Sequence, residues 1–189
     1  MVGVEGNGGV PAEIVSVSVL DVPVSGGGPV LRSWLVRPET VILPAATAVH
    51  GIDNGAVRRA PLWHGVAREV EPVLTGRVVV VHDAPTSYRM LAEHLPAWRP
   101  VVVLDTLLLA QRLRRGLPDY SLRALVAEFG LAGDGLLPQH GGGVGRGALA
   151  VGWLMVELLR DESLDWDGVV GLAAVAPFEP VASCGAAGR

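Results

Sequence analysis

Short apolar runs alternate along the chain with amphipathic segments, which is the pattern of an α/β protein. Val78 to Val81 is a run of four valines, and Val101 to Leu104 is a second apolar run. Such runs predict strands that are buried on both faces of a covered sheet. A helical segment follows each strand, so His82 and Asp83 are expected at the carboxyl edge of the sheet, where open α/β sheets bind ligands.

The pattern before these strands predicts a β-hairpin. Residues 13–22 alternate apolar and polar positions, a glycine-rich turn follows at residues 26–29, and residues 30–36 form the return strand. After the hairpin, residues 60–74 carry apolar side chains at helical spacing. Ser121 is the expected N-cap of a later helix.

Composition narrows the class of protein. The 189 residues are half apolar and 18% charged, as in a compact globular domain. The net charge is −4 and every basic residue is arginine, with no basic stripe of the kind that binds nucleic acid. Cys184 is the single cysteine, which excludes a disulfide framework and a cysteine zinc site. No apolar run is long enough to span a bilayer, so we expect a cytoplasmic protein without membrane partners.

Two segments resemble motifs of the DnaQ-like (DEDDh) 3'-5' exonucleases. The family's first motif is Asp-x-Glu, and here Gly3 stands at the aspartate and Glu5 at the glutamate. The second motif is His-Asn-Ala followed by Phe-Asp. His82 and Ala84 match it, while Asp83 replaces the asparagine and Thr86 the phenylalanine. Ser87 stands where the family has a metal-binding aspartate.

The third motif of the family is a histidine followed five residues later by an aspartate and an alanine-rich helix. His140 matches the histidine, and Gly145 stands at the aspartate. The segment around His50 also resembles a His-Gly-Ile stretch that helps to shape the nucleotide pocket in the family, although His50 has an equally plain alternative role in capping a turn. The Leu-Asp-Thr segment at Asp105 is typical of the family too, and there the aspartate is mainly structural.

The resemblance implies an α/β fold, a ribonuclease H-like mixed five-stranded sheet with helices on both faces. Residues 1–160 would form this domain. Residues 161–189 would add a short helix near Trp166 to Ala173 and a flexible tail.

The resemblance also implies what chemistry is missing. The family's mechanism uses two divalent ions held by four carboxylates, with a histidine as base. Of these five positions the chain keeps Glu5 and His140. Glycine and serine cannot replace the carboxylates, so we expect no metal site and no cofactor. A residual metal-dependent exonuclease stays open, because Asp83 lies near Ser87 and would bind a single ion together with Glu5.

Two other interpretations stay open, and whether the chain is an enzyme is left undecided between them. In the first, which we favour, the pocket carries out metal-independent acid/base catalysis on a small organic substrate. In the second, a non-catalytic pseudo-exonuclease binds nucleic-acid ends weakly or a protein partner. The candidate catalytic residues are Glu5, His140 and Asp83. The candidate pocket residues are His82, Ser87, His50, Gly141 and Gly145. The oligomeric state is not predicted.

The glycine-rich segment before the last long helix gives a separate expectation. Five of the seven residues from Gly141 to Gly147 are glycine, and each opposes a helix by about 1 kcal/mol relative to alanine. The helix is therefore expected to begin near Ala148. The segment before it would form a loop over the pocket, acting either as a lid for a ligand or as a plain surface loop.

Overall fold

The computed structural model describes residues 1–23, 26–131, 144–160 and 162–177. In chain order the strands and helices are β1 (Val2–Gly6), β2 (Ile14–Asp21), β3 (Val30–Leu35), α1 (Pro44–His50), α2 (Asn54–Val57), α3 (Trp63–Leu74), β4 (Val78–Val81), α4 (Ala84–His94), β5 (Val102–Asp105), α5 (Thr106–Leu113), α6 (Leu122–Glu128), α7 (Arg146–Leu159), α8 (Trp166–Ala173) and β6 (Ala174–Val175).

The strands form two small sheets instead of the predicted single five-stranded sheet. The first is the antiparallel sheet β1-β2-β3, and the second has the order β4-β5-β6. β4 and β5 pair in parallel, while the short β6 pairs antiparallel with β5. β1 lies against β4, but among the described residues no ladder joins them. The α/β class and the mixed strand directions are confirmed, and the number of strands in one sheet was wrong.

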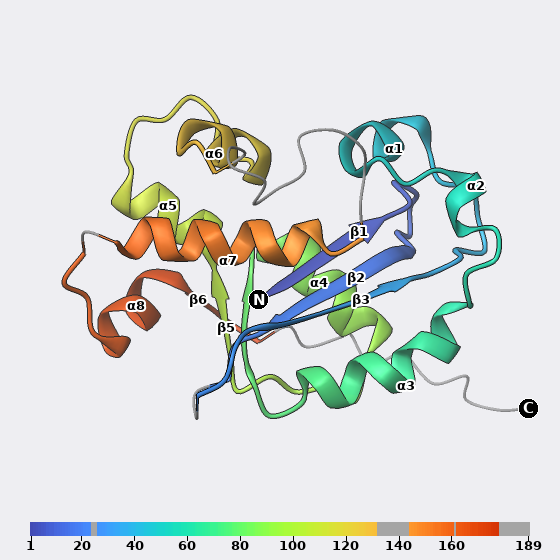
Figure 1. The fold of residues 1–189 in the computed structure, drawn as a ribbon, viewed down its shortest axis with the longest axis horizontal. Helices are drawn as coiled ribbons and strands as arrows, with labels where there is room; N and C mark the ends of the chain where they lie inside the picture. The colour runs from blue at the N-terminus through green and yellow to red at the C-terminus, as the bar shows by residue number, and fades with distance from the viewer. Residues whose placement is uncertain (24–25, 132–143, 161, 178–189) are drawn as a thin grey trace, which may run out of the picture.

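Helices cover both faces of the first sheet (Figure 1). α7 lies along one face, and α3 lies below the other. Val17 and Val19 of β2 form one buried cluster with Val66 and Val70 of α3, and this cluster continues into β4 and β5. A second cluster joins α7 to α5, α6 and α8. The two-sided burial therefore follows from the apolar strands, as their composition predicts.

Most element boundaries lie close to the predicted ones. The predicted hairpin is β2 and β3, and α8 has the bounds expected for the short C-terminal helix. Ser121 caps α6 as predicted, because its Oγ accepts a hydrogen bond from the amide of Ala124. The helix expected from residue 60 begins later, at Trp63, and α1 and α2 were not predicted.

The start of α7 differs from the expectation in a way that matters for the site. α7 begins at Arg146, with Gly145 as its N-cap at φ 107°. Gly147 is therefore inside the first turn of the helix and not in a loop. Only glycine adopts such a φ easily, so Gly145 fits the cap position. Within the described ranges, no helix is long and apolar enough to cross a membrane.

Candidate functional site

The first candidate residues lie on the face of β1 that α7 covers. Gly3 pairs with Ser18 and Glu5 with Ser16 of the antiparallel neighbour β2. Because side chains alternate along a strand, Gly3 and Glu5 share one face, while Val2 and Val4 face the buried cluster on the other. The alternation thus brings both positions of the first motif under the helix.

The backbone of α7 lies directly on Gly3. A Cβ atom added to Gly3 would stand 2.6 Å from Cα of Gly147 and 2.7 Å from the amide nitrogen of Ala148. A Cβ on Gly147 would stand 3.0 Å from Cα of Gly3 and 3.6 Å from Oε1 of Glu5. Neither neighbour is a flexible side-chain end that can move aside. The space that any side chain at position 3 needs is therefore filled by helix backbone.

A buried serine holds this close approach in place. Ser18 Oγ accepts a hydrogen bond of 3.1 Å from the amide of Ala148, and it lies 3.4 Å from the carbonyl oxygen of Gly3, to which it donates. The amides in the first turn of a helix have no partner within the helix. Ser18 satisfies one of them and at the same time links α7 to β1 and β2.

Glu5 is partly buried beside this contact. Among the described residues, no hydrogen bond or ion pair engages its carboxylate. Burial raises the pKa of Glu5 from its ordinary value of 4.5 to about 7. The side chain therefore exchanges a proton near neutral pH, as a general acid or base does.

His82 is buried at the end of β4, and both of its ring nitrogens have protein partners. Nε2 lies 3.0 Å from the carbonyl oxygen of Tyr120 and Nδ1 lies 2.9 Å from Oγ1 of Thr106. Burial lowers the pKa of His82 and so favours the neutral ring. A carbonyl can only accept, so Nε2 carries the hydrogen. The Thr106 hydroxyl, which has a single hydrogen, lies between Nδ1 and the carbonyl oxygen of Val81, which is 3.1 Å away. The ring thus ties β4 to α5 and to the segment before α6.

Asp83 has an unusual backbone conformation at the N-cap of α4. Its φ is 58° and its ψ 71°, and it is the one non-glycine residue of the described ranges with positive φ. Asn and Asp tolerate this region better than other side chains. The carboxylate accepts a 2.8 Å hydrogen bond from the Thr86 hydroxyl. The structure thus gives Asp83 a conformational role, and its catalytic role stays a prediction.

Asp105, fully buried at the end of β5, organises the same corner. Its Oδ1 accepts from the amides of Asp83 and Leu107, and its Oδ2 accepts from the amide of Ala84. One carboxylate therefore caps the starts of α4 and α5 together. The structural role implied by the resemblance agrees with this geometry.

Ser87 and His50 are both engaged by backbone. The Ser87 hydroxyl donates to the carbonyl of His82 at 3.0 Å. His50 Nδ1 accepts from the amide of Ile52 at 3.1 Å, so Nε2 carries the hydrogen and donates to the carbonyl of Gly6 at 3.2 Å. Burial lowers the pKa of His50. The ring closes the turn after α1 and fixes it to the end of β1, next to Glu5.

The remaining candidates are divided between described and undescribed parts of the chain. His140 and Gly141 lie outside the described residues. Gly145 is buried, and a Cβ there would meet the Leu31 side chain on β3 at 3.2 Å, away from Glu5. The residue of α7 that faces Gly3 and Glu5 is Gly147, which the sequence reasoning placed in a loop. The signal for this role of Gly147 was its position, two residues after Gly145 and on the buried side of the helix.

The Asp, Glu, His and Cys side chains of the described residues do not form a metal site. Within residues 1–23, 26–131, 144–160 and 162–177, no three His, Cys, Asp or Glu side chains come together to hold an ion. Gly3 provides no oxygen, and the contact with Gly147 leaves no room for a carboxylate at that position. The described residues therefore do not fit a pair of hard divalent cations, which need several oxygen ligands.

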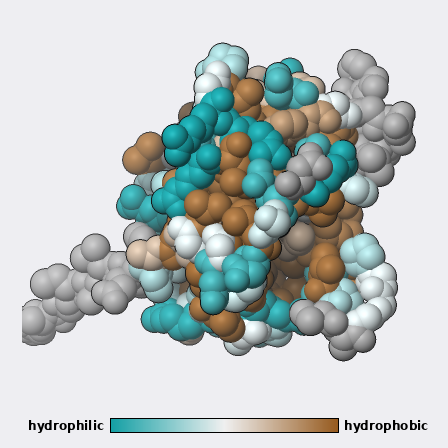
Figure 2. Space-filling model, turned by 90° about the vertical axis from the view of Figure 1, so that its left-hand side faces the viewer, coloured by the Kyte–Doolittle hydropathy of each residue, from teal (hydrophilic) through white to brown (hydrophobic). Residues whose placement is uncertain are grey.

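The arginines that lie close together in the sequence, at positions 58 and 59 and at positions 112, 114 and 115, are distributed over the molecule. Arg58 and Arg59 follow α2, whereas Arg112 lies in α5, toward the opposite end of the molecule (Figure 1). Arg112 donates to the carbonyls of Gly171 and Leu172, and Arg114 pairs with Glu162 at 2.9 Å. On the face in Figure 2, apolar residues separate the hydrophilic ones. These arginines do not form one continuous surface.

Comparisons with known proteins agree with this architecture. No protein-family model matches the chain. A DNA polymerase III subunit epsilon-like protein from Rhodobacter capsulatus is 35% identical over 100 residues, which are 51% of this chain and 14% of that protein. This chain thus corresponds to a small part of that relative's length.

Solved structures match over more of the chain. Exonuclease X in complex with 5' overhanging duplex DNA has a TM-score of 0.65 at 22% identity, covering 90% of this chain and 96% of that one. E. coli Exonuclease I in complex with a dT13 oligonucleotide has a TM-score of 0.59 at 15% identity, covering 85% of this chain and 40% of that one. The chain thus has an α/β, ribonuclease H-like fold. More narrowly, it has the DnaQ-like exonuclease fold, as the resemblance implied.

Proposed function

We propose that this chain is an exonuclease-fold protein without two-metal nuclease chemistry, which acts as a non-catalytic module that binds a protein partner. The contact between Gly3 and Gly147 carries the first half of the proposal. Two-metal hydrolysis needs carboxylates that hold both ions beside the attacking and leaving oxygens. Here helix backbone occupies the space that the first of those carboxylates needs.

The choice of a protein partner over a nucleic acid rests on charge. Binding to nucleic acid is dominated by contacts between basic side chains and phosphates. The net charge is −4, and Arg112 and Arg114 are already engaged by carbonyls and by Glu162. Fold neighbours were solved with DNA and with an oligonucleotide, so weak binding of a nucleic-acid end is the alternative within this proposal.

A second candidate function is favoured by one observation, the burial of the Glu5 carboxyl group, which raises its pKa to about 7. A carboxyl group with this pKa can give and take protons at neutral pH, so the metal-independent acid/base chemistry expected from the sequence keeps its central residue. His140 is its proposed partner. The two cavities lined by described residues lie beside β3 and beside His94, and Glu5 lines neither of them.

A nuclease assay tests the main proposal. Purified protein is incubated with end-labelled single-stranded DNA or RNA and with magnesium or manganese, beside the variant Glu5→Gln. We expect no shortening of the oligonucleotide by either protein. Trimming by the wild type that a chelator stops and that Glu5→Gln lacks would overturn the proposal. Equal trimming by both proteins would indicate a contaminating nuclease, and a further purification step then repeats the comparison.

The second candidate makes a different prediction. Turnover of a small organic substrate would continue in the presence of a chelator, and Glu5→Gln and His140→Ala would each abolish it while far-UV circular dichroism stays unchanged. Full activity in both variants would exclude this pair of residues from the chemistry.

A further inference from the structure

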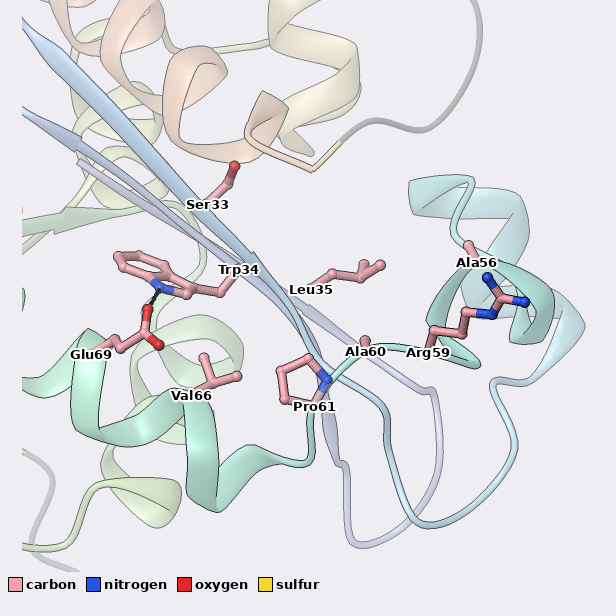
Figure 3. Close-up of a pocket in the computed structure, with 9 residues that line it drawn as sticks. All are labelled: Ser33, Trp34, Leu35, Ala56, Arg59, Ala60, Pro61, Val66 and Glu69. Atoms are coloured by element: carbon pink, nitrogen blue, oxygen red, sulfur yellow. Dashed lines mark hydrogen bonds between the residues drawn. The ribbon is translucent and has the colours of Figure 1, made fainter.

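A groove lies along the free edge of β3, next to α3. Its volume is about 440 Å³, and it lies between β3 and the segment that joins α2 to α3 (Figure 3). Ser33, Trp34 and Leu35 of the edge strand form one wall. Ala60, Pro61 and Val66 form much of the other. Apart from Arg59, none of the residues discussed for the exonuclease-like site lines it.

The pairing of β3 with β2 shows which backbone groups face this groove. The amide of Val36 donates to the carbonyl of Val15 at 2.8 Å, so position 36 points toward β2. Antiparallel pairing alternates inward and outward groups. By this alternation Arg32 and Trp34 also bond to β2, whereas the amides and carbonyls of Leu31, Ser33 and Leu35 point away from it. Within the described chain, no hydrogen bond occupies these outward groups.

The chain itself begins to pair with this edge. Position 37 is the next outward position, and the amide of Arg37 donates to the carbonyl of Pro61 at 2.8 Å. The segment then leaves the edge, because α3 starts at Trp63. The segment around Pro61 therefore already pairs with one end of the β3 edge. It does not reach the outward backbone groups of Leu35 and Ser33.

The side chains of the groove define what an occupant would carry. Trp34 provides apolar surface, and its indole N–H donates to Glu69 Oε2 at 2.9 Å, which engages that carboxylate. Val66 and Pro61 are apolar neighbours. Arg59 lines the groove, and among the described residues no acid forms an ion pair with it. The groove thus offers backbone hydrogen bonds, an apolar centre, one positive charge at Arg59 and one negative charge at Glu69, whose carboxylate accepts from Trp34.

We propose that the β3 groove binds an extended peptide segment of a partner protein, which adds a strand to β3 and carries an apolar residue and an acidic residue. The inference rests on the proposed function, because it names the surface through which a non-catalytic module would act. Strand addition uses the free backbone groups for affinity and the side-chain groove for selectivity. The acidic residue of the peptide would face Arg59.

Hydrogen exchange followed by NMR tests the edge without any substitution. In the free protein the amides of Leu31, Ser33 and Leu35 should exchange fast, and those of Arg32 and Trp34 slowly. The probes are peptides selected from a random phage-displayed library on the whole chain. A selected peptide should slow exchange at Ser33 and Leu35 by about tenfold or more, as expected when amides gain hydrogen bonds.

Two matched pairs of variants test the groove itself. Ser33→Pro removes an outward amide without removing a bond to β2, since proline is tolerated on edge strands. It should weaken peptide binding about tenfold or more, and Ser33→Ala should not.

Arg59→Glu should weaken binding of acidic peptides about fivefold or more, and Arg58→Glu, at the neighbouring exposed position, should have little effect. Circular dichroism checks the fold of each variant, and exchange in the wild type decides the matter if Ser33→Pro does not fold.

Several results would overturn the inference. These are the absence of any selected peptide, peptides that bind Ser33→Pro as tightly as the wild type, or protection at amides away from β3. A dimer in solution that Ser33→Pro dissociates would show that a second copy uses this edge, and it would also overturn the inference. The nuclease assay fails or succeeds separately, because it tests Glu5 of β1, whereas the peptide experiments test Ser33 of the edge strand β3 and Arg59 after α2.

Discussion

The contact of Gly3 with Gly147 couples two residues that lie far apart in the sequence. The missing carboxylate at position 3 could be seen from the sequence, because glycine stands in an otherwise matching motif. The close contact that fills the space at position 3 could not be seen from the sequence, because it depends on how closely α7 packs on β1. Gly147 was consequently assigned to a loop, although it is the helix residue nearest to both Gly3 and Glu5.

Substitution of Gly3 tests this closure. Gly3→Ala should lower the free energy of unfolding by about 1–3 kcal/mol, because the added Cβ meets backbone atoms that cannot rotate away. The measurement is urea unfolding of both proteins.

Gly171→Ala in α8 is the matched control, because a Cβ there meets nothing within 4 Å. Alanine also favours a helix over glycine, so this variant should be as stable as the wild type or up to about 1 kcal/mol more stable. A Gly3→Ala variant of unchanged stability would show that α7 sits less closely on β1.

The ionisation of Glu5 gives a second residue-level prediction. The pKa of about 7 lies above the ordinary 4.5, so folding favours the protonated carboxyl group. This contribution is fully present below pH 4.5 and is lost as the pH rises through about 7. The difference between the two pKa values corresponds to about 3 kcal/mol at most, and to less because the side chain is partly exposed.

Urea unfolding at a series of pH values checks this prediction. The wild type should lose stability relative to Glu5→Gln between pH 4.5 and about 7, since glutamine does not ionise. A constant difference between the two proteins over this range would mean that Glu5 titrates normally.

At the level of elements, the sequence predicted those strands and helices that depend on short-range patterns of apolar and polar residues. The alternation of β2 and β3 and the valine run of β4 predicted these strands correctly, because the hydrophobic period and the burial of a strand are properties of a short segment. The start of α7 was misplaced for the opposite reason. Glycine propensity predicts a late start near Ala148, whereas packing on β1 and the bond to Ser18 stabilise a start at Arg146.

Ser18 therefore has a testable role in placing α7. Ser18→Ala should cost about 1–3 kcal/mol of unfolding free energy, because the buried amide of Ala148 loses its acceptor. Urea unfolding measures the loss, and hydrogen exchange at Ala148 should become faster. Ser33→Ala, on the exposed partner strand, should stay within about 0.5 kcal/mol of the wild type. Equal stability of both variants would show that α7 does not depend on this bond.

At the level of the whole molecule, the sequence predicted the layers but not the division of the sheet. Each strand is specified by its own residues, whereas a ladder between β1 and β4 depends on the spacing that α4 and α7 impose on both. The two sheets still share one core, because Val17 and Val19 of the first pack in the same cluster as Val79, Val81 and Val103 of the second.

This shared core predicts a single cooperative unfolding transition. Tryptophan fluorescence and far-UV circular dichroism should give the same midpoint in urea, as expected when neither sheet can unfold without exposing the common cluster. Two separated transitions would show that the sheets are independent folding units.

The close contact under α7 also constrains the order in which mutations can act. An aspartate placed at position 3 would meet the backbone of Gly147 before it could serve any ion, so its effect depends on a prior change that moves the helix outward. The same substitution would then be harmful in one genetic background and tolerated in another. Under the proposed function, a path to nuclease activity would have to start in α7 or at Ser18, away from the position of the carboxylate itself.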